Sequence, residues 1–283
     1  MPASTPRHVI QILLLAPLTA SAQNILPLDF SQNVQDTDAI YPNNSTLGPE
    51  YYSGHTFDFV NVTTANGHSI DARVTILGTA GGYEFVGWLP DYNSDAGEPQ
   101  GDLGVYYKHD GDFSAPLGGI AYTLSFYEGG GAFTNAAVLS DFRLLIYDHD
   151  GEPGQSESIR TYEADGFAGF QIRDGSGIHS HHEGDTWRFD AGGQGLSETG
   201  PEGSFIAYYQ NTSSIRFDMF STTSPSNPAG NSGIFAAFDG NLSLTGGLTT
   251  NFAAFVPVPE PSSASLTAAA ISLSLLRRCR TKS

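Results

Sequence analysis

Apolar and polar residues alternate along several segments between residues 55 and 246. This period of two predicts half-buried antiparallel strands, because successive side chains of a strand point to opposite faces. In SIDARVTILG, the expected core residues are Ile70, Ala72, Val74 and Ile76, and Asp71, Arg73 and Thr75 fall on the other face. The segments AYTLSFYE, SDFRLLIY and SIRFDMF predict further core residues, namely Tyr122, Leu124, Phe126, Phe142, Leu144, Ile146, Ile215, Phe217 and Met219.

Short turn sequences separate these runs, among them ANGH, HDGDF, EGGGAF, RDGSG and FDGNLS. Their Gly, Asn and Asp residues tolerate the positive φ angles of tight turns. Close-spaced strands without crossover helices indicate an all-β fold. We therefore expect one antiparallel β-sandwich of jelly-roll-like type. In the pairs Tyr106-Tyr107 and Tyr208-Tyr209, alternation predicts that one member points into the core.

The N-terminal residues have the three-part layout of a secretory signal peptide. A start that contains Arg7 is followed by an apolar run and then by Ala20-Ser21-Ala22. Cleavage is expected between Ala22 and Gln23. A buried N-terminal helix is the alternative, but Pro17 would break it.

The C-terminal residues also form three successive parts. VPEPSS begins at residue 258, and its prolines favour an extended backbone. The apolar segment from Ala264 to Leu276 follows; as a helix it covers roughly 20 Å, a short transmembrane span. A basic cluster then includes Arg277, Arg278 and Arg280, which would stay on the cytoplasmic side as a membrane stop. The alternative is a plain proline linker before a C-terminal helix.

This tail resembles the PEP-CTERM sorting signal of Gram-negative bacteria. The resemblance implies recognition at Pro259, Glu260 and Pro261 by an exosortase, a membrane-embedded cysteine protease, and removal of the tail during export. The apolar segment is shorter and richer in Ser and Thr than is usual in that family. The expected organisation is a signal peptide (1–22), a β-sandwich body (23–246, core 55–246), a linker (247–257) and the sorting and anchor segment (258–283).

The charge of the chain is strongly acidic, with a formal net charge of −18. Between the terminal segments there are only 7 basic residues and 29 acidic ones. This balance argues against a nucleic-acid partner, since phosphate binding requires basic side chains. The single cysteine, Cys279, lies in the basic tail, so the body has no disulfide available.

The segment YDHDGEPGQSE is the candidate site with the most oxygen ligands. Asp148 and Asp150 follow an apolar strand, and Glu152 and Glu157 follow across a Gly-containing turn. Calcium prefers several oxygen ligands around one point, so these four carboxylates predict a calcium site. An exposed acidic turn is the alternative, because the spacing is not that of an EF-hand.

Two other segments suggest ligand binding. HSHHEGD contains His179, His181 and His182, which could bind zinc or copper or form a solvated hairpin tip. Trp88 and Trp187 could serve as stacking platforms for sugar rings.

Taken together, these features predict an exported, non-enzymatic protein of the cell surface or extracellular matrix. Exosortase-sorted proteins as a family are associated with exopolysaccharide and biofilm, and the body's alternation and Asp-Gly turns resemble adhesin-type β-sandwich modules. The expected partners are the secretion machinery, an exosortase, the membrane through a transient C-terminal anchor, and polysaccharide. The alternatives are a calcium-assisted carbohydrate-binding module and a secreted jelly-roll glycoside hydrolase.

Overall fold

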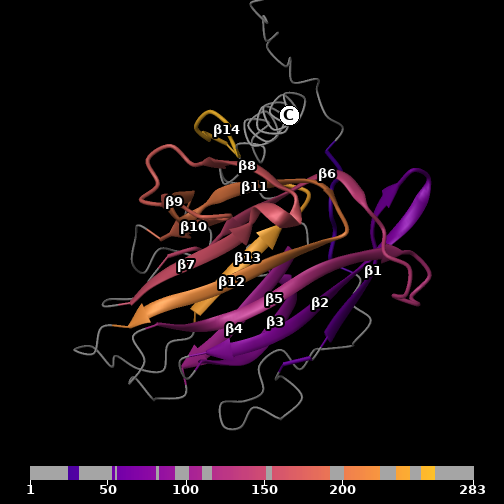
Figure 1. Cartoon of the computed structure of the whole chain (residues 1–283), viewed down its shortest axis with the longest axis horizontal. Coiled ribbons are helices and arrows are strands. Elements are labelled where there is room, and N and C mark those ends of the chain that lie inside the picture. Colours follow the sequence, from indigo (N-terminus) through magenta and orange to yellow (C-terminus); the bar gives the residue numbers. More distant parts are fainter. Residues whose placement is uncertain are drawn as a thin grey trace, which may run out of the picture.

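The alternating segments pair into two antiparallel sheets, each with seven strands among the described residues (Figure 1). Helical structure there is confined to two single turns, η3 (Glu163–Asp165) and η4 (Pro201–Gly203). The expectation of an all-β antiparallel fold is therefore confirmed. The structure is a computed structural model that describes residues 25–31, 53–54, 56–80, 83–92, 102–109, 117–150, 155–191, 201–223, 234–242 and 250–258.

The strand order within each sheet brings distant segments of the chain together. In the first sheet the order is β1 (Thr56–Ala65), β2 (His68–Ala80), β5 (Leu117–Glu128), β12 (Ser214–Thr223), β7 (Gln155–Tyr162), β10 (Thr186–Asp190) and β9 (His179–Glu183). In the second sheet it is β14 (Val256–Pro257), β8 (Phe167–Ile172), β11 (Phe205–Thr212), β6 (Leu139–Tyr147), β13 (Ile234–Asp239), β4 (Asp102–His109) and β3 (Tyr83–Tyr92).

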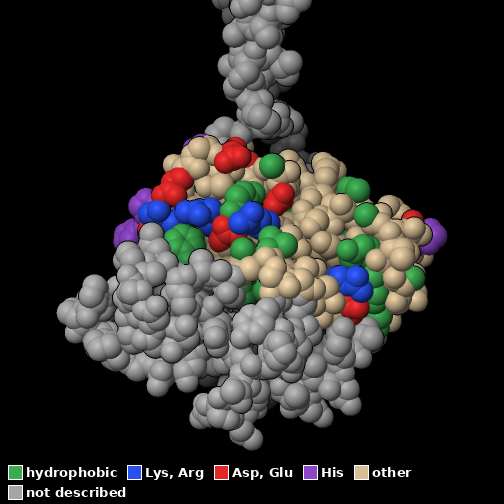
Figure 2. Space-filling model, turned by 60° about the horizontal axis from the view of Figure 1, so that its bottom comes forward, with side chains coloured by type: hydrophobic (Ala, Val, Ile, Leu, Met, Phe, Trp, Pro, Cys, Tyr) green, Lys and Arg blue, Asp and Glu red, His purple; other side chains and the backbone are tan. Residues whose placement is uncertain are grey.

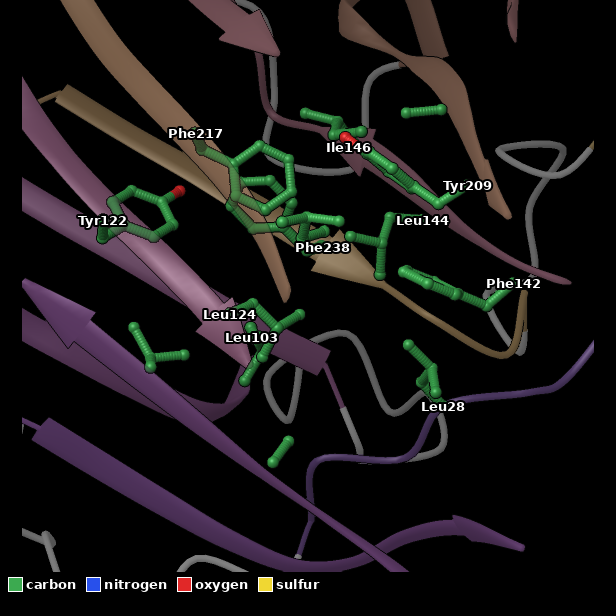
Figure 3. Packing of buried hydrophobic residues seen from close by; sticks show 14 of the residues in the cluster. Leu28, Leu103, Tyr122, Leu124, Phe142, Leu144, Ile146, Tyr209, Phe217 and Phe238 are labelled. Carbon is green, nitrogen blue, oxygen red and sulfur yellow. The ribbon is translucent and has the colours of Figure 1, made fainter. Parts of the chain in front are cut away.

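The core lies between the inner faces of the two sheets and is rich in aromatic residues (Figure 3). Phe217 of β12 packs against Phe238 of β13 and Tyr209 of β11, with ring centroids 5.3 and 6.2 Å apart. Phe126 of β5 likewise meets Phe142 of β6 at 5.1 Å. These contacts join the sheets face to face, because each pair takes one ring from each sheet.

The four strands predicted in most detail have the predicted inner faces. In β2, for example, Ile70 and Val74 are buried, and Arg73 between them is only partly buried. The same alternation holds in β5 and β12. The residues confirmed in the core are Ile70, Ala72, Val74, Ile76, Tyr122, Leu124, Phe126, Phe142, Leu144, Ile146, Ile215, Phe217 and Met219.

The Tyr208-Tyr209 pair behaves as predicted. Tyr209 is buried, and its hydroxyl lies 2.9 Å from Thr161 Oγ1 on the opposite sheet. Burial raises the pKa of Tyr209, so the phenol is neutral and can share this hydrogen bond between the sheets. Tyr208 is only partly buried on the other face of β11. The side chains of Tyr106 and Tyr107 lie outside the described part of the structure.

Some outward-facing positions on both sheets are buried as well, which alternation alone does not predict. Asp71 has no exposed surface, because its carboxylate accepts hydrogen bonds from the backbone N–H groups of Asn61 (2.9 Å) and Gly131 (2.7 Å). It thereby joins the irregular part of β1 to the loop after β5. On the outer face of the second sheet, a smaller cluster consists of Leu145, Tyr147, Ile206 and Ala237.

Residues 25–31, which form no strand, also contribute to the core. Leu28 and Phe30 are fully buried, and Phe30 meets Phe59 edge to face at 5.7 Å. Leu28 N donates to the Gly240 carbonyl at 3.0 Å. A Cβ at position 240 would lie 2.5 Å from Leu28 Cβ, so only glycine permits this close approach.

The C-terminal residues 251–258, hereafter the C-terminal strap, lie along β8 and contain β14, the edge strand of the second sheet (Figure 1). Val256 pairs with Phe170 and Pro257 pairs with Gly169. Phe252 packs against the outer cluster of the second sheet. Much of the segment expected to be a linker (247–257) thus contacts the folded body, through backbone hydrogen bonds and the packing of Phe252.

Candidate functional site

The acidic turn after β6 is organised around a buried histidine. The strand ends at Tyr147, and Asp148 takes a left-handed conformation with φ 54°. His149 then points inward and has no exposed surface, and its backbone N–H donates to the Gly203 carbonyl at 3.1 Å. Asp148 and Asp150 flank it and are partly exposed. The turn is therefore fixed by the buried side chain of His149. The sequence pattern did not predict that this residue is buried.

Glu157 is also buried, at 5% exposure, and is directed toward this histidine. Its Oε2 lies 4.0 Å from His149 Nδ1. Glu152, the remaining predicted calcium ligand, is outside the described residues. Within the described ranges, no group of three or more His, Cys, Asp and Glu side chains could hold a metal ion. The calcium site at Asp148, Asp150, Glu152 and Glu157 stays a prediction.

The His149 imidazole is uncharged at neutral pH. Its Nε2 lies 2.9 Å from the Phe189 carbonyl oxygen, which can only accept, so Nε2 bears the hydrogen. Burial lowers the pKa of His149 to about 4, against the opposing effects of the Phe189 carbonyl and the Asp190 carboxylate. The 4.0 Å separation from Glu157 is accordingly not an ion pair at pH 7.

The histidines of HSHHEGD lie on the β9–β10 hairpin and use separate carboxylates. His181 Nε2 lies 3.1 Å from Asp190 Oδ2, on the outer face of the first sheet. His182 Nε2 lies 2.9 Å from Glu163 Oε1, which belongs to η3. The two rings therefore point to opposite sides of the strand and do not converge on one point, as a zinc or copper site requires.

Trp187 is engaged by neighbouring protein groups. His182 stacks on the indole at 4.7 Å with an interplanar angle of 15°, and Phe170 packs against it at 5.0 Å. The indole Nε1 donates to Glu163 Oε1 at 3.0 Å. This indole is thus a packing element between the hairpin, η3 and β8, and it does not present the bare face that sugar stacking uses. The Trp88 side chain lies outside the described part.

Three arginines form a row on the outer face of the first sheet, each with acidic partners. We call this row, Arg160, Arg188 and Arg216, the arginine row. Figure 2 shows basic side chains gathered on one face with acidic ones beside them. The ion pairs include Arg188 with Asp190 (2.8 Å), Arg188 with Glu183, Arg216 with Asp218 (2.9 Å) and Arg160 with Glu183 (3.5 Å).

Electrostatics and aromatic contacts keep this row in place. Burial by itself would raise the pKa of Asp190, but hydrogen bonds from Arg188 and Ser158 outweigh that effect and lower it. Arg216 lies over the Tyr162 ring at 4.8 Å and Arg160 over Phe220 at 4.9 Å. The positive charges are therefore neutralised within the sheet face, and this row is not an open phosphate-binding surface.

The predicted export residues lie outside the described part of the chain. These are Ala20, Ala22 and Gln23 at the signal-peptide end, Pro259, Glu260 and Pro261 of the sorting motif, and Arg277, Arg278 and Arg280 of the membrane stop. In the described ranges, no helix has both the length and the apolar character needed to cross a bilayer.

No protein-family model matches the sequence, and no curated protein shows significant sequence similarity to it. Among solved structures, the N-terminal domain of the Streptococcus gordonii adhesin Sgo0707 matches 67% of this chain with 12% identity and a TM-score of 0.44. The match spans 47% of that domain's chain.

The adhesin domain of PrgB from Enterococcus faecalis also matches 67% of this chain. Its DNA-bound structure gives 14% identity, a TM-score of 0.39 and coverage of 68% of that chain. A second structure of this adhesin domain gives 15% identity, a TM-score of 0.37 and coverage of 64% of that chain. Likenesses this remote carry no argument about the function of the present chain.

Proposed function

We propose that this protein is an exported, non-enzymatic protein of the cell surface or extracellular matrix, sorted by an exosortase. The observation that carries the proposal is the order of the C-terminal parts: Pro259-Glu260-Pro261, then an apolar segment, then Arg277, Arg278 and Arg280. The signal-peptide layout of residues 1–22 is consistent with it. In this proposal the jelly-roll-like body is cargo, and the tail anchors it in the membrane at least transiently.

The chemistry of the described residues is in keeping with a passive body. His181 and His182 of the β9–β10 hairpin are engaged by Asp190 and Glu163, and His149 is buried. We propose polysaccharide of the matrix as the surrounding material. A nucleic-acid partner is not part of the proposal, because the net charge is −18 and the arginine row is paired with carboxylates.

Mass spectrometry of the protein released by the producing cells tests the export route. We expect the mature chain to start at Gln23 and to lack Arg277, Arg278 and Arg280. The variant Glu260→Ala, which alters the motif, is expected to remain in the membrane fraction with its tail. Glu202→Ala removes the same charge from the exposed η4 turn and should be processed normally. An intact C-terminal segment outside the cell would contradict exosortase sorting.

Calcium titration tests the acidic turn separately. If Asp148, Asp150, Glu152 and Glu157 form a site, calcium at 100 times its dissociation constant stabilises the fold by about 2.7 kcal/mol. That corresponds to a rise of roughly 5–10 °C in melting temperature. Asp148→Asn combined with Asp150→Asn should remove the rise, and Asp174→Asn, on another exposed turn, should not. A wild-type melting temperature unchanged by millimolar calcium contradicts the site.

A further inference from the structure

The C-terminal strap is held on β8 mainly by backbone hydrogen bonds. Asp174 N donates to the Asn251 carbonyl at 2.8 Å, Ala253 N to the Ile172 carbonyl at 2.9 Å, and Val258 N to the Ala168 carbonyl at 2.9 Å. The last of these bonds ends one residue before the proposed sorting motif. The folded body therefore reaches the residue that precedes Pro259.

None of the strap's side chains is fully buried, although Phe252 and Val258 pack against hydrophobic clusters of the body. Phe255 meets Tyr208 edge to face at 5.2 Å and is 46% exposed, and Val256 is 41% exposed. Gln171 Nε2 donates to the Ala253 carbonyl at 2.8 Å. A segment with few buried apolar contacts opens at a lower free energy than the core. We therefore expect the strap to detach from β8 without unfolding of the sandwich.

At Pro257, the outer edge of the strap has no N–H to offer to a further strand. In an extended chain, successive N–H groups point to opposite sides, and Val258 N–H points to β8. Pro257 therefore occupies the position whose N–H would point away, and proline has none. The sequence repeats this spacing at Pro259 and Pro261. A partner that pairs with residues 257–261 as a strand must therefore bind the edge that carries the N–H groups. At Val258 this edge is already occupied by β8.

The distance between the body and the predicted anchor is also short. Five residues, 259–263, separate Val258 from Ala264. Pro261 is three residues beyond Val258 and can lie no more than roughly 10 Å from it, at about 3.5 Å per residue. While the strap is docked, the motif therefore stays close to the folded body, which restricts the approach of an enzyme to it.

We propose that docking of the C-terminal strap on β8 gates removal of the tail. The processing enzyme binds residues 259–261 productively only after the strap leaves β8. This inference rests on the proposed function, because it presumes that the tail is processed. Its physical basis is that the enzyme can bind only those molecules whose strap has left β8. The apparent affinity of the enzyme for the motif is lowered in proportion to that fraction.

Gly169→Ala opens the strap without altering the tail. A Cβ at position 169 would lie 2.3 Å from Phe255 Cζ and 2.5 Å from the Val256 carbonyl oxygen, and the φ of +157° at Gly169 also disfavours a side chain, so the strap and the adjoining backbone of β8 must shift apart. Gly78→Ala is the matched control, since a Cβ there meets nothing within 4 Å. We expect faster hydrogen exchange of residues 251–258 in the solubilised full chain of Gly169→Ala, and tail removal in producing cells faster by about fivefold or more.

A second variant lengthens the chain between the strap and the sorting motif while the strap remains docked. Insertion of six Gly and Ser residues between Val258 and Pro259 should accelerate tail removal and leave exchange of the strap unchanged. Faster exchange in Gly169→Ala with an unchanged rate of tail removal would overturn the gate and leave the proposed function intact. Failure of the wild-type tail to be removed at all would instead reject the proposed function, and the gate with it. Unaltered processing in both variants also overturns the gate.

Discussion

Replacing Phe217 by alanine is expected to lower the free energy of unfolding by about 3–5 kcal/mol. Phe217 is 2% exposed, and its ring contacts Tyr122, Tyr209 and Phe238 from both sheets. Removing it leaves a cavity between the two sheets, and the loss combines the transfer and cavity contributions. Denaturant-induced unfolding, followed by tryptophan fluorescence and by far-ultraviolet circular dichroism, gives the difference.

Phe220→Ala is the matched control for this experiment. Phe220 lies on the same strand, β12, but its ring is on the outer face, under the Arg160 guanidinium. Because it is only partly buried, we expect its loss to cost about 1 kcal/mol. Equal destabilisation by the two substitutions would mean that the core does not lie between the sheets as described.

Lowering the pH from 6.5 to 4 is expected to reduce the stability of the fold by about 3 kcal/mol through His149 alone. The folded state holds this imidazole neutral, with a pKa of about 4, because it is buried. The unfolded chain takes up a proton near pH 6.5, so in this window the unfolded state binds more protons than the folded state. The contribution of His149 is complete above pH 6.5 and is lost as the pH falls toward 4.

The variant His149→Gln separates this effect from the titration of carboxylates. Gln cannot be protonated, but its amide N–H can still donate to the Phe189 carbonyl. We therefore expect the variant to be less stable at pH 7 and to have a shallower dependence of unfolding free energy on pH between 6.5 and 4. Urea unfolding at several pH values measures both slopes. Identical slopes in wild type and variant would show that His149 is accessible to protons in the folded state.

Local alternation was sufficient to predict the inner faces of β2, β5, β6 and β12. Strand side chains alternate regardless of what lies opposite, so a period of two can be read without knowledge of the fold. The same rule correctly divided Tyr208 from Tyr209. Alternation alone does not predict that Leu145 and Tyr147 are buried too. A different signal does: the unbroken apolar run from Leu144 to Tyr147 is typical of a strand that is covered on both faces.

The candidate sites depended on contacts that no local pattern contains. The turn at Asp148 and Asp150 resembles a solvated acidic loop, yet His149 between them is buried against β10 and Glu157 is turned toward it. His181 and His182 are adjacent in the sequence but are bound by carboxylates on opposite faces of the sheet. The arginine row similarly arises from three strands that are separated in the chain.

The amino-acid sequence by itself determined the all-β fold class, the core-facing side of the strands, the acidic charge and the order of the parts of the tail. Each of these depends on composition or on short-range spacing. Only the tertiary structure decided that Asp71 and His149 are buried, that the arginines are neutralised and that the C-terminal strap is docked on β8. The reason is that burial and ion pairing depend on which distant segments meet. Antiparallel sheets bring together residues whose separation along the chain carries no sign of their contact.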